Sequence, residues 1–119
     1  MFFFDTYALV EVAKGNPAYK TYGDFAVIVT HLNIGEFYIY LLRANGKVEA
    51  EKKLASIAFT TIPLNTELMK EAAEFKQVHN SKELSWADCV GYITARQLGL
   101  KFLTGDSGFK GTPHVEFVK

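Results

Sequence analysis

The stretch Phe25-Ala26-Val27-Ile28-Val29 indicates the fold class of this chain more directly than any other. All five residues are apolar, and the valines and isoleucine favour an extended backbone. No polar residue alternates with them, so the run predicts a strand buried on both faces, as in a parallel sheet. Thr30 follows at once and can cap a helix that runs to about Asn45-Gly46, where a glycine stop is normal.

The rest of the chain continues this alternation of short apolar runs and longer helical patterns. We expect further strands at about residues 2–4, 60–64, 101–104 and 115–118, and further helices at about 6–14, 18–22, 47–59, 66–79 and 85–99. Strands that alternate with helices predict a three-layer α/β/α sandwich with a mainly parallel central sheet. We expect one domain over residues 1–119, because no linker or repeat divides the chain.

The composition of the chain excludes several classes of protein. The 119 residues are 49% hydrophobic and 22% charged, which suits one domain with an ordinary core. Thirteen basic residues balance thirteen acidic ones, which excludes a strongly basic nucleic-acid-binding composition but not nucleic-acid binding itself. A single cysteine excludes an internal disulfide and a cysteine-rich zinc site. No membrane span or signal peptide is apparent, so we expect a soluble, cytoplasmic protein.

Four acidic residues stand at the starts of elements and have mainly apolar neighbours. Asp5 follows the first expected strand, and Asp106 follows the fourth after Gly105. Glu36 and Asp88 lie early in apolar helices. Ligands of open parallel sheets bind beyond the carboxyl ends of the strands, so these four residues are our candidate site.

Three of the four acids also have an ordinary structural explanation. Asp5 can be the N-cap of the first helix. Asp88 stands three residues after Ser85, which is the spacing of a capping box. Asp106 lies in a glycine-rich turn, where aspartate is common. Taken singly, each of these residues is compatible with a purely structural role.

Glu36 is harder to explain structurally. Its neighbours at −4, −3, +3 and +4 are Leu32, Asn33, Ile39 and Tyr40, so no helical ion pair is available. A carboxylate on such a helix needs a cleft or a cation, unless it lies on a thin exposed polar strip.

Asp88 begins a similar helix. The helix over residues 86–93 is almost wholly apolar, which predicts that it is buried on all sides. Asp88 would therefore enter the interior or a pocket at the first turn. Gly91 leaves one side of this helix open for close approach.

Four converging carboxylates repel one another unless a hard divalent cation lies among them, and oxygen ligands suit Mg²⁺ or Mn²⁺. Zinc is less suitable, because the three histidines lack helical ligand spacing and Cys89 lies on an apolar helix as an expected core residue. Without the four acids, nine acidic residues face thirteen basic ones. This excess suits a polyanionic substrate. Arg43, Lys14 and Lys110 are the bases nearest in sequence to the candidate elements.

Four segments of the chain, in order and with suitable spacing, resemble the PIN domain family. They are residues 4–9 (Phe-Asp-Thr-Tyr-Ala-Leu), 32–38 (Leu-Asn-Ile-Gly-Glu-Phe-Tyr), 84–89 (Leu-Ser-Trp-Ala-Asp-Cys) and 102–109 (Phe-Leu-Thr-Gly-Asp-Ser-Gly-Phe). Each motif is weak alone, but the ordered set spans nearly the whole chain. The resemblance is closest to the small VapC-like PIN proteins of prokaryotic toxin–antitoxin pairs.

The resemblance implies a metal-dependent ribonuclease that acts on single-stranded or structured RNA. It also implies a homodimer that is inhibited by a small antitoxin whose tail reaches into the acidic groove. By position, the family's catalytic and metal-binding acids correspond to Asp5, Glu36, Asp88 and Asp106. Thr6 and Thr104 match hydroxyl positions that support the acids, although both are equally compatible with ordinary cap and turn roles.

Two other functions share parts of this pattern. One is a catalytically silent PIN-like module that binds RNA or regulates a partner. The other is a phosphoacceptor α/β domain, which needs an acceptor aspartate after a central strand and a lysine after a later one. Here the central strand ends in Val29-Thr30-His31, and Lys101 precedes its strand, so the sequence disfavours this function.

Overall fold

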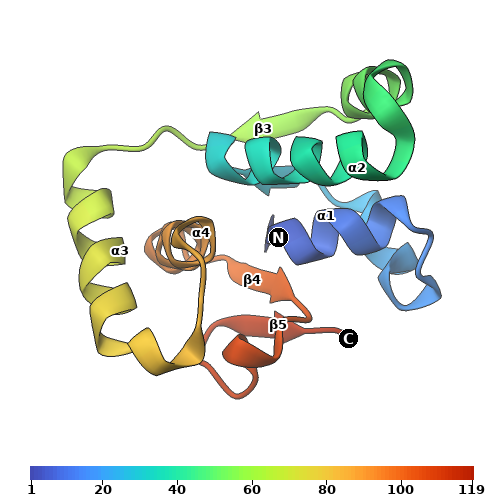
Figure 1. Ribbon diagram of the computed structural model, residues 1–119. Coiled ribbons are helices and arrows are strands. Elements are labelled where there is room, and N and C mark those ends of the chain that lie inside the picture. Colours follow the sequence, from blue (N-terminus) through green and yellow to red (C-terminus); the bar gives the residue numbers. More distant parts are fainter.

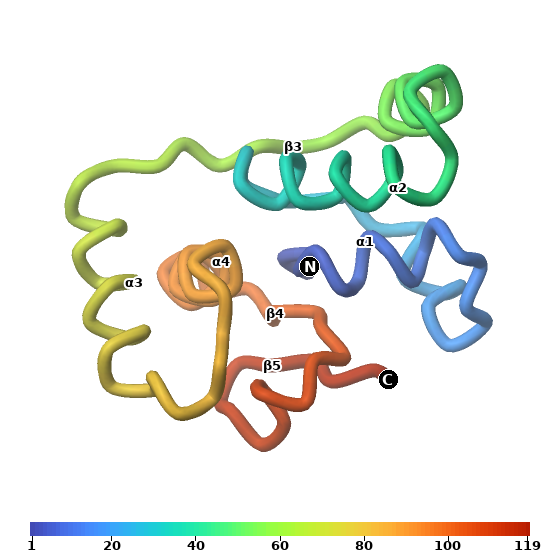
Figure 2. Tube along the Cα trace, viewed as in Figure 1, coloured from blue at the N-terminus to red at the C-terminus, as the bar shows by residue number.

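The centre of the protein is an open sheet of five parallel strands. The computed structural model describes all residues from Met1 to Lys119 (Figures 1 and 2). The strands are β1 (Phe2–Phe4), β2 (Val27–Val29), β3 (Phe59–Thr61), β4 (Lys101–Thr104) and β5 (Val115–Phe117), in the spatial order β3-β2-β1-β4-β5. In the central register Phe3 lies between Ile28 and Phe102. The parallel sheet predicted from the sequence is confirmed.

The helices are α1 (Thr6–Ala13), α2 (His31–Ala55), α3 (Thr66–Val78) and α4 (Trp86–Gln97), with short 3₁₀ turns η1 (Pro17–Asp24), η2 (Asn80–Lys82) and η3 (Ser107–Phe109). The helix expected over residues 18–22 is a 3₁₀ helix, the helix expected over 47–59 is the latter part of α2, and the other expected helices are present. Figure 2 follows the chain from β3 across to α3. No helix of the protein combines the length and apolarity that crossing a membrane requires. The expected boundaries differ from these by a few residues; Phe25 and Ala26, for example, precede β2.

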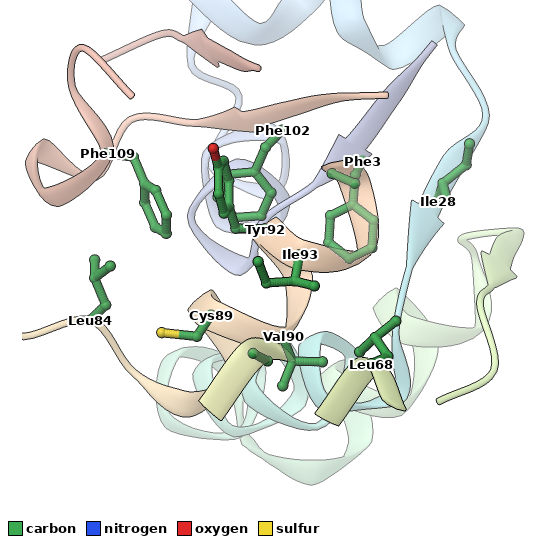
Figure 3. Close-up of a cluster of buried hydrophobic side chains, with 12 residues drawn as sticks. Phe3, Ile28, Leu68, Leu84, Cys89, Val90, Tyr92, Ile93, Phe102 and Phe109 are labelled. Carbon is green, nitrogen blue, oxygen red and sulfur yellow. The ribbon is translucent and has the colours of Figure 1, made fainter. Parts of the chain in front are cut away.

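Successive strand residues point to opposite faces, and each face has its own core. Phe3, Ile28 and Phe102 pack against α3 and α4. The next residue of each strand packs on the other face against α1 and α2; these are Phe4, Val29 and Leu103. Figure 1 shows α3 and α4 on one side of the sheet and α1 on the other, and Figure 3 shows the first core. The three-layer sandwich is therefore as expected.

Two glycines shape the helical layers. Gly46 has φ 78° and ψ 169°, so α2 stops there and restarts as a second helical segment, as the sequence predicts. Gly91 of α4 faces the sheet, where a Cβ would lie 2.9 Å from Cε1 of Phe3 and 3.2 Å from that of Phe102. The absence of a side chain lets α4 approach the two rings closely.

The strand order changes direction between β1 and β4. The chain builds β1, β2 and β3 in one direction and then returns to add β4 and β5 on the other side of β1. The order therefore reverses between β1 and β4, and such a switch point is where open α/β sheets bind ligands. The residues that follow Phe4 and Thr104 lie at this switch point.

Candidate active site

Asp5 directly follows β1 and is 1% exposed. Its Oδ1 accepts a hydrogen bond from the amide of Thr6 at 2.8 Å, so Asp5 does cap α1. Its Oδ2 accepts from the hydroxyl of Thr104 at 2.7 Å, which ties it to the end of β4. Asp5 therefore caps α1 and also lies at the switch point of the sheet.

Thr104 connects Asp5 to Asp106. The Thr104 side chain is fully buried, and its Oγ1 accepts a hydrogen bond from the amide of Asp106 at 3.1 Å. Asp106 Oδ1 in turn accepts from the amide of Gly108 at 2.9 Å and caps η3. The turn role expected for Asp106 is therefore present, and no hydrogen bond occupies its Oδ2.

Asp88 forms the capping box that its spacing predicts. The amide of Ser85 donates to Asp88 Oδ2 at 2.9 Å, and the amide of Asp88 donates to Ser85 Oγ at 3.0 Å. These bonds fix the first turn of α4 and leave Asp88 half-buried near Asp5 and Asp106.

Glu36 of α2 joins the other three acids through hydroxyl groups. Thr6 Oγ1 donates to Glu36 Oε1 at 2.7 Å, and Ser85 Oγ lies 3.5 Å from Glu36 Oε2. Glu36 is half-buried and contacts Thr6 at the start of α1 and Ser85 at the N-cap of α4, so it is not on an exposed strip. No lysine, arginine or histidine forms an ion pair with any of the four acids.

Two polar residues of this network were not among the expected site residues. Ser85 was expected only as a cap, yet it also reaches Glu36. Asn33 is fully buried, and its Nδ2 donates to Thr6 Oγ1 at 3.3 Å. Its Oδ1 accepts from the amide and hydroxyl of Thr30, at 3.1 and 2.9 Å. Asn33 could have been predicted from the sequence, because it precedes Glu36 by three residues and therefore lies on the same face of the helix.

The acids influence one another electrostatically. Burial, together with the charges of Asp88 and Asp106, raises the pKa of Asp5 well above its usual range, against the hydrogen bonds from Thr104 and Thr6. Burial also raises the pKa of Asp88; the charge of Asp106 acts in the same direction, and hydrogen bonds from Ser85 oppose it. The site is therefore a concentration of negative charge that the protein does not neutralise.

Comparison with known proteins identifies the family. The sequence profile of the PIN domain matches residues 2–115. The chain belongs to the PIN domain family. The resemblance that the four sequence motifs suggested is therefore confirmed. No curated protein matches the chain.

Two solved structures share the PIN fold over nearly their full lengths. One is VapC20 of Mycobacterium tuberculosis, described as a sarcin-ricin-loop-cleaving toxin, with a TM-score of 0.78, 20% identity and full coverage of both chains. The other is a toxin–antitoxin complex from Klebsiella pneumoniae, with a TM-score of 0.73 and 18% identity over 98% of this chain and 96% of that one. At these identities the likeness concerns the fold.

The donor set of this PIN domain suits a hard cation. All four side chains offer oxygen, and unneutralised negative charge surrounds the buried Asp5. No three His, Cys, Asp or Glu side chains are grouped as ligands of one metal ion. Amides and hydroxyls form hydrogen bonds to oxygens of all four acids. An incoming cation would have to share or replace some of these bonds.

Two of the bases nearest in sequence to the candidate elements have partners of their own, and one expectation about burial near the site is wrong. Lys14 pairs with Glu11 at 3.2 Å, and Lys110 lies over the ring of Phe117, so neither is free at the acids. Trp86, expected inside a helix buried on all sides, is 36% exposed. Cys89 is buried as expected, and burial raises the pKa of its thiol to about 11, which makes it unreactive.

A mostly apolar cavity of the protein is separate from the acids. It has a volume of about 660 Å³ and mostly apolar walls, which include Val12, Phe25 and Ile57. It lies near the amino ends of β2 and β3, whereas the acids lie beyond the carboxyl ends of β1 and β4. The candidate active site is therefore defined by its chemistry and not by cavity size.

Proposed function

We propose that this PIN domain is a metal-dependent endoribonuclease that hydrolyses RNA phosphodiester bonds, and that it is the toxin of a toxin–antitoxin pair. The observation that carries the proposal is the hydrogen-bonded network that draws Asp5, Glu36, Asp88 and Asp106 to the switch point without a neutralising base. A sheet-edge cluster of this kind is suited to a divalent cation and a phosphodiester. The solved relative described as cleaving the sarcin-ricin loop supports RNA as the substrate class.

The four acids have distinct roles in the proposed reaction. Asp5 and Asp88 would hold Mg²⁺ or Mn²⁺ directly, and Glu36 and Asp106 would be further ligands, through water or to a second ion. When bound, the cation lowers the pKa of a water molecule and neutralises charge on the phosphoryl oxygens.

Two threonines support these acids. Thr104 fixes one oxygen of Asp5, and Thr6 fixes one oxygen of Glu36. Rigid support of this kind preserves the geometry of ligating carboxylates. No histidine is required as a base, which agrees with the absence of histidine from the network.

The proposal includes two protein partners. A solved structural relative is a toxin–antitoxin complex, which supports a small antitoxin as an inhibitor. A homodimer is supported by apolar side chains on the outer side of α2, where Ile39 is 50% and Leu42 is 37% exposed. We place the protein in the cytoplasm, where RNA and a co-expressed antitoxin are available.

Product analysis tests the nuclease function. Purified protein is incubated with a fluorogenic RNA and Mn²⁺, alongside an Asp5→Asn variant and an Asp24→Asn control, whose acid lies outside the site in η1. We expect cleavage by the parent and the control only. Because water and not the 2′-hydroxyl attacks, the products should carry 5′-phosphate and 3′-hydroxyl ends. Cyclic-phosphate ends would contradict the mechanism, and RNA binding without cleavage would favour the silent RNA-binding module.

A further inference from the structure

The segment that follows β5 packs against the end of β4. The amide of Val118 donates a hydrogen bond to the carbonyl of Thr104 at 2.9 Å, so the pairing with β4 continues beyond β5 itself. Gly105 is buried under this segment. A Cβ at Gly105 would collide with the carbonyl oxygen of Val118 and would lie 2.8 Å from Cζ of Tyr7. The link from Thr104 to Asp106 is therefore clamped between Tyr7 and Val118.

A buried tyrosine holds this segment in place. Tyr19 of η1 is 1% exposed, and its hydroxyl donates a hydrogen bond to the carbonyl oxygen of Val118. That oxygen is the atom that a Cβ at Gly105 would strike. The centroid of the Tyr19 ring lies 6.5 Å from that of Tyr7, so Tyr19 lies beside both residues of the clamp. Figure 1 shows the chain beyond β5 running toward the turn that follows α1, where η1 lies.

Hydrogen bonds continue from this tyrosine to two of the acids. The backbone of Val118 links Tyr19 to Thr104, because its carbonyl accepts from the phenol and its amide donates to the carbonyl of Thr104. The Thr104 hydroxyl donates to Asp5 Oδ2 at 2.7 Å and accepts from the amide of Asp106 at 3.1 Å. The contacts from Tyr19 to both acids therefore pass through Val118 and Thr104 without a break.

We propose, on the basis of the nuclease function above, that Tyr19 is a positioning residue of the active site. It fixes the Val118 carbonyl against Gly105, and so it fixes Asp5 and Asp106 at the carboxyl ends of their strands. Carboxylates that are already held in place bind a cation more tightly than mobile ones, because less ordering is needed on binding. Without the Tyr19 hydroxyl, the segment after β5 loosens and the two acids become more mobile.

A purely structural role for Tyr19 is the alternative. A buried hydroxyl that donates to a carbonyl stabilises any fold, so a loss of stability alone does not decide between the two roles. Tyr22 provides the matched control. It belongs to the same 3₁₀ helix, and its hydroxyl donates to Glu116 Oε2 of β5 at 2.6 Å. Its bond also connects η1 with β5, but it ends on a side chain and not on the backbone that packs against Gly105.

Binding of Mn²⁺ tests the positioning role without RNA. The 119-residue protein is titrated with Mn²⁺, and the free ion is followed by electron paramagnetic resonance. We expect Tyr19→Phe to weaken binding about 10-fold, the lower end of the range for residues that support metal ligands, and Tyr22→Phe to leave it unchanged. In EDTA, hydrogen exchange of the Asp106 amide, measured by NMR, should become faster in Tyr19→Phe only. Equal effects of the two substitutions on both quantities would overturn the proposal.

A substitution at Gly105 tests the clamp from its other side. Gly105→Ala places a methyl group where the Val118 carbonyl and the Tyr7 ring lie, so the end of β4 must move. We expect it to weaken Mn²⁺ binding at least as much as Tyr19→Phe does. Gly23→Ala is the matched control, because a Cβ there would have no heavy atom within 4 Å. Unchanged Mn²⁺ binding by a Gly105→Ala protein that near-ultraviolet circular dichroism shows to be folded would overturn the proposal.

The outcomes separate this inference from the nuclease function. If the parent, Tyr19→Phe and Tyr22→Phe all bind Mn²⁺ and cut RNA equally well, the positioning role is wrong and the nuclease function stands. If the Asp106 amide responds to Tyr19→Phe alone but the parent neither binds Mn²⁺ nor cuts RNA, the positioning role stands and the nuclease function fails. In an active protein, Tyr19→Phe should raise the Mn²⁺ concentration for half-maximal cutting about 10-fold, and saturating Mn²⁺ should restore the rate. A lower rate with an unchanged Mn²⁺ dependence would show a merely structural role and overturn the proposal.

Discussion

Removal of the Asp5 charge should stabilise the metal-free protein. Asparagine is isosteric with aspartate, so Oδ1 can still accept from the amide of Thr6, and the new amide can donate to Thr104 Oγ1. The charge that burial, Asp88 and Asp106 all disfavour is lost. Active sites of this type are built at a cost in stability that such substitutions recover.

The expected size follows from these contacts. Two hydrogen bonds are retained, the Thr104 hydroxyl must find another acceptor, and the repulsion from two acids is relieved. We expect Asp5→Asn to raise the free energy of unfolding in EDTA by about 1–2 kcal/mol. For a chain of this size the melting temperature should rise by about 4–8 °C. Differential scanning calorimetry measures both quantities, and Asp24→Asn is the control that should leave them unchanged.

In excess Mn²⁺ the parent protein should become more stable than the Asp5→Asn variant, the reverse of their order in EDTA. A ligand at about 100 times its dissociation constant stabilises the native state by about 2.7 kcal/mol. The parent should gain this amount, whereas Asp5→Asn should gain little. A variant that is less stable than the parent in EDTA would show that Asp5 is only a helix cap, and equal Mn²⁺ shifts would show that it is not a ligand.

Asp5 should also make the stability of the metal-free protein depend on pH. Asp5 has a folded pKa raised above its ordinary value of 3.8, so the native state binds the proton more tightly than the unfolded state. The stabilisation is complete below about pH 4 and is lost as the pH rises through the folded pKa. Urea unfolding of the metal-free parent should therefore show this loss, and the Asp5→Asn variant should lack it. An identical pH dependence in the two proteins would contradict the raised pKa.

Three further substitutions test the network and the packing beneath it. Glu36→Gln can keep the bond from Thr6 and should leave stability unchanged, but RNA cleavage should fall about 10- to 100-fold; full activity would remove Glu36 from the site. Ser85→Ala should cost about 1 kcal/mol as a lost cap, while Ser85→Thr should not, as urea denaturation can show. Gly91→Ala places a methyl group 2.9 Å from the Phe3 ring and should destabilise the fold by about 1–3 kcal/mol; a higher melting temperature would refute the close approach of α4.

Much of the fold was predictable because burial leaves a periodic signature. The apolar run that ends at Val29 and the alternation of elements indicated a parallel sheet, and the acids after Phe4 and Thr104 followed from strand ends alone. The boundaries of β2 were harder to predict from the sequence. The strand β2 begins at Val27, where pairing with Phe59 begins. Hydrophobicity in the sequence indicates which residues are buried, but it does not indicate where pairing with the neighbouring strand begins or ends.

The contacts within the site could be predicted only in part. The capping box of Ser85 and Asp88 is local and was predicted. The Ser85–Glu36 contact joins residues 49 positions apart, and it depends on how the starts of α1, α2 and α4 pack. Trp86 was expected to be buried because its helix is apolar on all sides. Ala87 and the residues from Cys89 to Ala95 are buried, but Trp86 at the first position of α4 is not.

The most direct test of the central claim is the anomalous scattering of a crystal soaked in Mn²⁺. We predict one or two strong peaks among the carboxylates of Asp5, Glu36, Asp88 and Asp106, and none in crystals of the Asp5→Asn variant at the first-ion position. Peaks only elsewhere on the molecule, or no peak among the four acids at saturating Mn²⁺, would contradict a metal-dependent active site at the carboxyl ends of β1 and β4.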